Sequence, residues 1–139
     1  MVLDMIELIN KLITTSYPNI QAVYLFGSYG TEYERPDSDV DIALLFDVHQ
    51  AGIIKDLLFS ECSMALAAAL KKDVDLINLR RVNTVLQHEI VQGGRVILIQ
   101  DEYAKDLFEM LVLSAYQKLN EERAEILQEI QRSGRILNI

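Results

Sequence analysis

Two aspartates separated by one residue, Asp39 and Asp41, stand at the start of an apolar segment that is typical of a buried strand. Alternate residues of a strand point to the same face, so both carboxylates project together while Val40 points the other way. Like charges on one face repel each other, and a divalent cation between them would relieve that repulsion. Oxygen ligands with little nitrogen or sulfur nearby suit magnesium. The alternative is a solvent-exposed pair that discourages aggregation at the edge of a sheet.

A Gly-Ser pair, Gly27 and Ser28, directly follows another apolar segment, residues 20–26. Glycine permits close backbone approach, and serine is a favoured cap for a short helix that would begin at Tyr29. The free N–H groups of such a turn, together with the serine hydroxyl, can hold phosphate oxygens. Taken alone, the pair describes an ordinary capped turn equally well.

A second pair of alternating acids, Asp73 and Asp75, begins a third apolar segment. If that segment is a strand beside the one that begins at Asp39, one of its carboxylates completes a cluster of three acids. Three carboxylates can hold two cations, one on a triphosphate and one on an attacking oxygen, and the third acid can instead accept the attacker's proton. Alternation does not distinguish the two residues. We favour Asp75, which lies deeper in the apolar segment, and expect Asp73 to close the preceding loop.

The pattern of apolar residues predicts the elements that position these side chains. Steps of three and four residues predict helices, and short runs of branched and aromatic residues predict strands. The expected helices are residues 2–15, 52–70, 82–92 and 103–132, and the expected strands are residues 20–26, 39–46, 73–79 and 95–100. Strands that alternate with helices indicate an α/β (α+β) fold, with a small mixed sheet of about four strands and helices packed mainly on one side of it or at its ends.

No linker rich in Pro, Gly or Ser divides the sequence, so we expect a single domain over residues 1–139. The catalytic core is expected over about residues 1–100. The long C-terminal helix, about residues 103–132, is more than a small sheet needs for cover. We therefore expect its outer end to contact a partner.

The composition excludes several classes of protein. The chain has 13 Lys and Arg against 21 Asp and Glu, a net charge of −8, and residues 1–70 hold 10 of the acids but only 3 of the bases. Broad nucleic-acid binding normally needs a basic surface, so we expect no direct nucleic-acid binding. The single cysteine, the absence of a basic-then-apolar leader and the absence of an apolar run of about 20 residues predict a cytoplasmic protein that does not enter a membrane.

The three motifs together resemble the signature of the polymerase-β-like nucleotidyltransferase superfamily. That signature is a Gly-Ser pair, ten intervening residues and Asp-x-Asp, here Gly27-Ser28 and Asp39-x-Asp41, with a third acid further on, here Asp75. The surrounding residues YLFGSYGTEYERPDSDVDIALLF are similar to the minimal nucleotidyltransferase (MNT) branch of the family. The resemblance covers roughly residues 1–100.

This resemblance implies the nucleotidyltransferase fold in one minimal domain and an enzyme that uses ATP as co-substrate with Mg²⁺, two ions being expected. Asp39 and Asp41 would be catalytic metal ligands, and Asp75 would be the third ligand or the base. Gly27 and Ser28 would bind the triphosphate of the nucleotide.

Short members of this family resemble the antitoxins of HEPN–MNT toxin–antitoxin modules. The resemblance implies transfer of AMP to a tyrosine of a cognate HEPN-type ribonuclease toxin, which the antitoxin neutralises in a hetero-oligomer; a homodimer also stays open. Two alternatives remain, a small-molecule nucleotidyltransferase of the aminoglycoside-modifying kind and a non-catalytic toxin-binding module. The sequence leaves the role of Arg35 open, because its guanidinium can reach a phosphate or pair with the acids around it.

Overall fold

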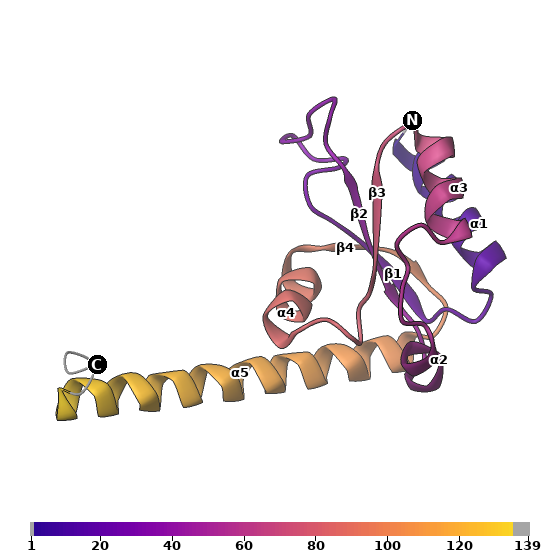
Figure 1. Ribbon diagram of the computed structural model, residues 1–139. Coiled ribbons are helices and arrows are strands. Elements are labelled where there is room, and N and C mark those ends of the chain that lie inside the picture. Colours follow the sequence, from indigo (N-terminus) through magenta and orange to yellow (C-terminus); the bar gives the residue numbers. More distant parts are fainter. Residues whose placement is uncertain (1, 135–139) are drawn as a thin grey trace.

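A four-stranded sheet lies at the centre of the protein (Figure 1). The computed structural model describes residues 2–134. Strand β1 (Ala22–Phe26) pairs antiparallel with both β2 (Val40–Leu45) and β4 (Arg95–Ile99), while β3 (Val74–Asn78) runs parallel to β2. The order across the sheet is β3-β2-β1-β4, which confirms the expected mixed sheet of four strands.

Helices cover both faces of this sheet. Within residues 2–134 the helices are α1 (Val2–Ser16), α2 (Val48–Ile53), α3 (Glu61–Leu70), α4 (Thr84–Gly93) and α5 (Glu102–Ser133). One buried cluster joins α1 and α3 to Val23 and Leu25 of β1, and a second joins α4 and α5 to Ala22 and Tyr24 of the same strand. The expectation of cover mainly on one side or at the ends was therefore wrong. Both alternating faces of β1 are apolar, so each face needs a helix to exclude water.

The single helix expected over residues 52–70 was also wrong. That range contains the end of α2, a connection that is not helical, and α3. α2 ends at Ile53, and α3 begins after Ser60, whose hydroxyl accepts a hydrogen bond from Ser63 N at 3.2 Å. Phe59 has a φ of 62°, a left-handed conformation that an α-helix cannot contain. Leu57 is nevertheless buried, so the apolar period continues through a segment that is not helical.

The long C-terminal helix is confirmed as α5, 32 residues that span about 48 Å at 1.5 Å per residue. Only its first part is held against the sheet. Phe108 and Val112 are buried there, and the Tyr24 hydroxyl donates a 2.5 Å hydrogen bond to Glu109. The rest projects away from the sheet (Figure 1). In residues 2–134 no helix has the length and apolar character that crossing a membrane would require.

Candidate active site

The acids predicted from the sequence meet at one end of the sheet. The parallel register of β2 and β3 places Asp41 directly beside Asp75, and the antiparallel register places Phe26 on the other side of Asp41. Paired residues in neighbouring strands lie about 5 Å apart, so the two carboxylates are adjacent. Asp39 comes two residues before Asp41 and shares its face of the sheet, the face covered by α4 and α5.

Asp73 has a different place from Asp75. Its backbone oxygen accepts a 2.9 Å hydrogen bond from Val40 N, which joins the start of β3 to the start of β2. This bond extends the pairing of β2 and β3 by one residue. The Asp73 side chain is exposed and shares the face of Asp75, and its closing of the preceding loop stays a prediction.

The acids influence one another electrostatically. Burial raises the pKa of the Asp41 carboxyl above its ordinary value, and the charges of Asp75 and then Asp39 raise it further. Such a pKa means that the ionised cluster is unfavourable by itself, which a bound cation would correct. No three His, Cys, Asp or Glu side chains in residues 2–134 converge closely enough to enclose a metal ion unaided. Magnesium fits this set, because it commonly takes one or two carboxylates and completes its shell with waters and substrate phosphates.

The Gly-Ser turn lies directly against Asp41. Gly27 has a φ of +77°, and a Cβ atom added there would lie 2.3 Å from Asp41 Oδ2. Glycine is therefore required at this position both for the backbone conformation and for the space. The next residue, Ser28, donates from its hydroxyl to that of Ser38 at 3.2 Å, so its side chain is held near the start of β2.

The short helix expected from Tyr29 was wrong, because the residues between β1 and β2 form a loop of turns. Gly30 has a φ of +76°, which helical residues do not adopt. The N–H and hydroxyl of Thr31 both donate to Ser28 O, at 3.0 and 2.5 Å, and these bonds close a tight turn instead. We call residues 27–39 the Gly-Ser loop.

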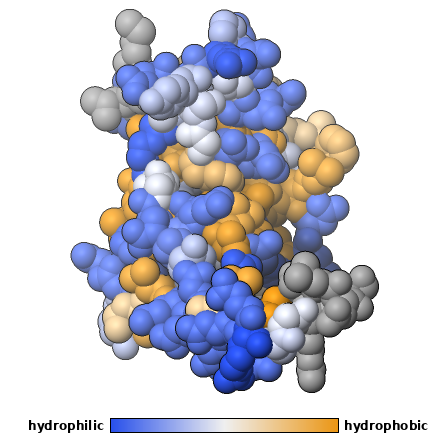
Figure 2. Space-filling view, turned by 90° about the vertical axis from the view of Figure 1, so that its left-hand side faces the viewer, coloured by the Kyte–Doolittle hydropathy of each residue, from blue (hydrophilic) through white to orange (hydrophobic). Residues whose placement is uncertain are grey.

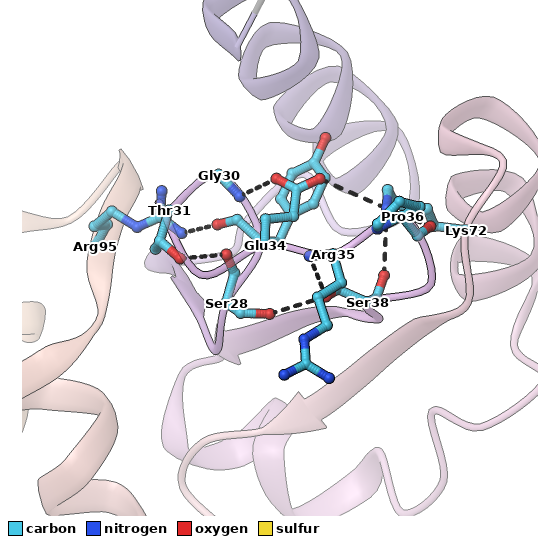
Figure 3. A network of polar contacts seen from close by, with 10 residues as sticks. Ser28, Gly30, Thr31, Glu34, Arg35, Pro36, Ser38, Lys72 and Arg95 are labelled. Atoms are coloured by element: carbon cyan, nitrogen blue, oxygen red, sulfur yellow. Dashed lines mark hydrogen bonds and ion pairs between the residues drawn. The ribbon is translucent and has the colours of Figure 1, made fainter.

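Three residues that the sequence analysis did not assign to the site hold this loop (Figure 3). The peptide group between Tyr29 and Gly30 is held at both ends. Its N–H, from Gly30, donates to Glu34 at 2.6 Å, and its carbonyl oxygen, from Tyr29, accepts a hydrogen bond from Arg95 of β4. Lys72, which precedes β3, forms an ion pair with Glu34 at 3.6 Å. Arg95 and Lys72 are distant from the loop in sequence, so no local pattern signalled them.

Arg35 remains available for an anion. Its backbone N–H donates to the Ser38 hydroxyl at 2.8 Å, while its guanidinium points away from Glu34 and Lys72 (Figure 3). Within residues 2–134 that guanidinium has no carboxylate at ion-pair distance, in spite of the acids beside it in sequence. The surface ion pair considered for it from the sequence is absent from the described structure.

The fold and this arrangement define a nucleotidyltransferase: a mixed sheet in which a Gly-Ser turn after one strand lies against an acid of the next strand, and that acid is paired with an acid of the third. Residues 7–103 match the family model described as "Polymerase beta, Nucleotidyltransferase", and the chain belongs to this family.

Known relatives carry the similarity over most of the chain. The chain is 36% identical over 122 residues to the protein adenylyltransferase MntA of Shewanella oneidensis. The aligned region covers 86% of this chain and 83% of the relative. A crystal structure of a toxin–antitoxin with AMP-PNP is similar at a TM-score of 0.73 and 32% identity, over 94% of this chain and 99% of that chain. A structure of tri-AMPylated Shewanella oneidensis HEPN toxin with MNT antitoxin is similar at a TM-score of 0.72 and 33% identity, over the same shares of the two chains.

Proposed function

We propose that this protein is an antitoxin that transfers AMP from ATP to a tyrosine of a cognate HEPN-type ribonuclease toxin and so neutralises it. The observation that carries the proposal is the contact of the Gly27 turn with Asp41, which is itself paired with Asp75. The family, the adenylyltransferase relative and the AMPylated toxin in a similar structure support the same reaction.

The residues have distinct roles in this proposal. Gly27 and Ser28 bind the triphosphate, and Asp39, Asp41 and Asp75 are the ligands of Mg²⁺, with two ions expected. The bound ions would neutralise the phosphate charge that develops during transfer. Without them, an acidic site in a chain with a net charge of −8 would repel a triphosphate.

The reaction is an in-line displacement at the α-phosphorus of ATP. The oxygen of the acceptor hydroxyl forms a bond to that phosphorus, the bond between the α-phosphorus and its bridging oxygen breaks, and pyrophosphate leaves. The hydroxyl proton passes to a carboxylate of the site. We propose Asp75 for that step, because its side chain is exposed and the residue is paired with Asp41.

The projecting part of α5 is the surface we propose for the toxin. Apolar side chains recur along one face of α5 at spacings of four and seven residues. They are Phe108, Val112, Leu119, Ile126 and Ile130. Only the first two of these are buried. We call the other three the distal stripe, an apolar surface of the kind that a partner protein covers.

The distal stripe and the acids face the same side of the molecule. The stripe continues the helix face that packs on the α4 and α5 side of the sheet, and Asp41 lies on that side of β2. In Figure 1 the Gly-Ser loop lies at the top, to the left of β3, and α5 projects to the lower left. Figure 2, which looks from the left, shows apolar surface between polar side chains above and below. A groove lies between the start of α4 and Leu119 and Arg123 of α5.

A toxin seated on this side would bring its tyrosine to the catalytic centre without a separate acceptor-binding domain. The similar structures that hold both a toxin and an antitoxin support this choice of occupant. We also infer that the protein works in the cytoplasm and does not bind nucleic acid itself, in keeping with its acidic composition.

The test is the mass of the co-expressed toxin. Toxin purified with the wild-type protein is expected to carry whole AMP units, and toxin purified with the Asp39→Asn/Asp41→Asn double variant to carry none. Asp37→Asn is the matched control, because Asp37 is an exposed aspartate of the same loop outside the acid cluster. Toxin without nucleotide in the wild-type sample would refute AMP transfer, and a double variant that still protects cells would favour the non-catalytic binding module.

A further inference from the structure

Lys72 connects the segment before β3 to the Gly-Ser loop through one ammonium group. Its Nζ donates to Pro36 O at 3.2 Å and to Ser38 O at 3.4 Å, and it lies 3.6 Å from a carboxylate oxygen of Glu34. The Lys72 side chain is only 18% exposed. A lysine on a surface would leave its ammonium in water, whereas this one is directed at three successive parts of the loop (Figure 3).

The partners of Lys72 are the residues that shape the loop around the nucleotide-binding turn. Glu34 accepts the hydrogen bond from Gly30 N, and the Ser38 hydroxyl accepts those from Arg35 N and Ser28 Oγ. The Ser28–Ser38 bond joins the two ends of the loop, and the other two bonds shape the turns between them. Lys72 binds Glu34 and Ser38 at the same time. These two residues accept the hydrogen bonds of Gly30 N and Ser28 Oγ, so Lys72 holds both acceptors in place.

The position of Lys72 in the chain links this loop to the third acid. Lys72 comes three residues before Asp75, and the intervening Asp73 carbonyl holds Val40 N at 2.9 Å. Asp39 lies between Ser38, which Lys72 contacts, and Val40. A displacement of the Lys72 contacts would therefore be transmitted to the residues on both sides of Asp39.

We propose that Lys72 is a positioning residue of the nucleotide site. Its ammonium, bound to Pro36 O, Ser38 O and Glu34, holds the Gly-Ser loop so that Ser28 and Asp39 stand beside the paired acids. Charge-assisted hydrogen bonds from a partly buried ammonium are stronger than neutral ones, which suits this task. The inference rests on the proposed function for its nucleotide, and its first test does not require that function.

The first test is amide hydrogen exchange of the nucleotide-free protein, followed by NMR. Lys72→Met is expected to speed exchange at Gly30 and Arg35 N–H several-fold, since the acceptors of both depend on Lys72. Lys71→Met is the matched control, because it removes an equal charge from the adjacent exposed residue, whose side chain makes no hydrogen bond or ion pair to the loop within residues 2–134. Unchanged exchange in Lys72→Met would overturn the proposal.

The second test separates positioning from folding. Lys72→Met is expected to weaken AMP-PNP binding in calorimetry and to raise KM for ATP about tenfold, with a smaller change in kcat, while Lys72→Arg recovers most of the affinity. The recovery is expected because a guanidinium can also donate to two carbonyls and a carboxylate. Similar thermal midpoints of Lys72→Met and Lys71→Met would exclude global unfolding as the cause of the weaker binding.

The outcomes distinguish this inference from the proposed function. A wild-type protein that binds AMP-PNP but modifies no toxin would refute the proposed acceptor and leave the Lys72 role supported by the binding and exchange results. A wild-type protein that binds no AMP-PNP would refute both. Normal AMP-PNP affinity in Lys72→Met, with active wild type, would overturn the role of Lys72 alone.

Discussion

Replacement of Gly27 by alanine tests whether the Gly-Ser turn and Asp41 form one site. The added Cβ would lie 2.3 Å from Asp41 Oδ2, and ordinary van der Waals contact begins at 3.4 Å, so the carboxylate must retreat by about 1 Å. Gly30→Ala provides a matched comparison. Gly30 has nearly the same positive φ, +76° against +77°, but its added Cβ would meet the flexible end of Arg95 instead of an acid.

The two variants should lose similar stability and very different activity. A non-glycine residue in the left-handed region costs about 1–2 kcal/mol, which for a domain of this size lowers Tm by several degrees. That penalty applies to both. A displacement of about 1 Å at a reacting centre can reduce turnover by about 10²-fold, and only Gly27→Ala displaces Asp41. The expected difference between the variants is therefore about 10²-fold in kcat.

The assay is AMP incorporation into purified toxin at saturating ATP and Mg²⁺, with Tm measured on the same samples. Gly52→Ala completes the series, because a Cβ at Gly52 meets nothing within 4 Å and the residue lies in α2. This variant should keep full activity and equal or slightly higher Tm. Equal activity of Gly27→Ala and Gly30→Ala would refute the reasoning, since it would mean that the contact with Asp41 has no part in the chemistry.

Three further predictions follow from other parts of the molecule. The pKa of Asp41 is raised in the folded protein, so its ionised form reduces the free energy of unfolding above that pKa, and this loss of stability disappears as the pH falls through it. Asp41→Asn should therefore raise Tm at pH 7 in EDTA, and by less as the pH is lowered. Mg²⁺ should raise the Tm of the wild type but not of the variant. Cys62 is buried, and burial raises the pKa of its thiol, so iodoacetamide should modify it at pH 8 only at the rate of unfolding; modification as fast as a free thiol would contradict this. Ile126→Asp should abolish co-purification of the toxin and preserve AMP-PNP affinity, whereas Leu127→Asp, at 60% exposure against 59% for Ile126, should have a weaker effect because Leu127 is not in the distal stripe.

The acid cluster could be predicted from the sequence because its geometry follows from local rules. Alternation within a strand places Asp39 and Asp41 on one face whatever the strand contacts. Only the assumption that the third strand lies beside the second was needed to add Asp75, and the parallel register of β2 and β3 confirms that pairing. The catalytic and metal-binding roles of these residues stay predictions that the variants above will test.

The Gly-Ser loop could not be predicted in the same way, because distant residues determine its shape. A serine after a glycine favours a helix cap, and that local rule was wrong at Tyr29. The loop instead follows a positive φ at Gly30 and contacts from Lys72 and Arg95, which are 34 or more residues away in sequence from their loop partners. Propensity is a weak guide where tertiary contacts of this kind decide the backbone.

The proposed function requires that an exposed site be specific for a protein acceptor. The chemical groups lie at an exposed end of the sheet, where Asp39 and Asp75 are open to an incoming hydroxyl. An open site of this kind has little means of selecting among hydroxyls by itself, so selection must come from whatever holds the acceptor in place. In the proposed function the distal stripe of α5, which continues the helix face that packs on the α4 and α5 side of the sheet, holds the toxin. Specificity would then depend on docking along α5, and a free tyrosine-containing peptide should be a far poorer acceptor than the intact toxin.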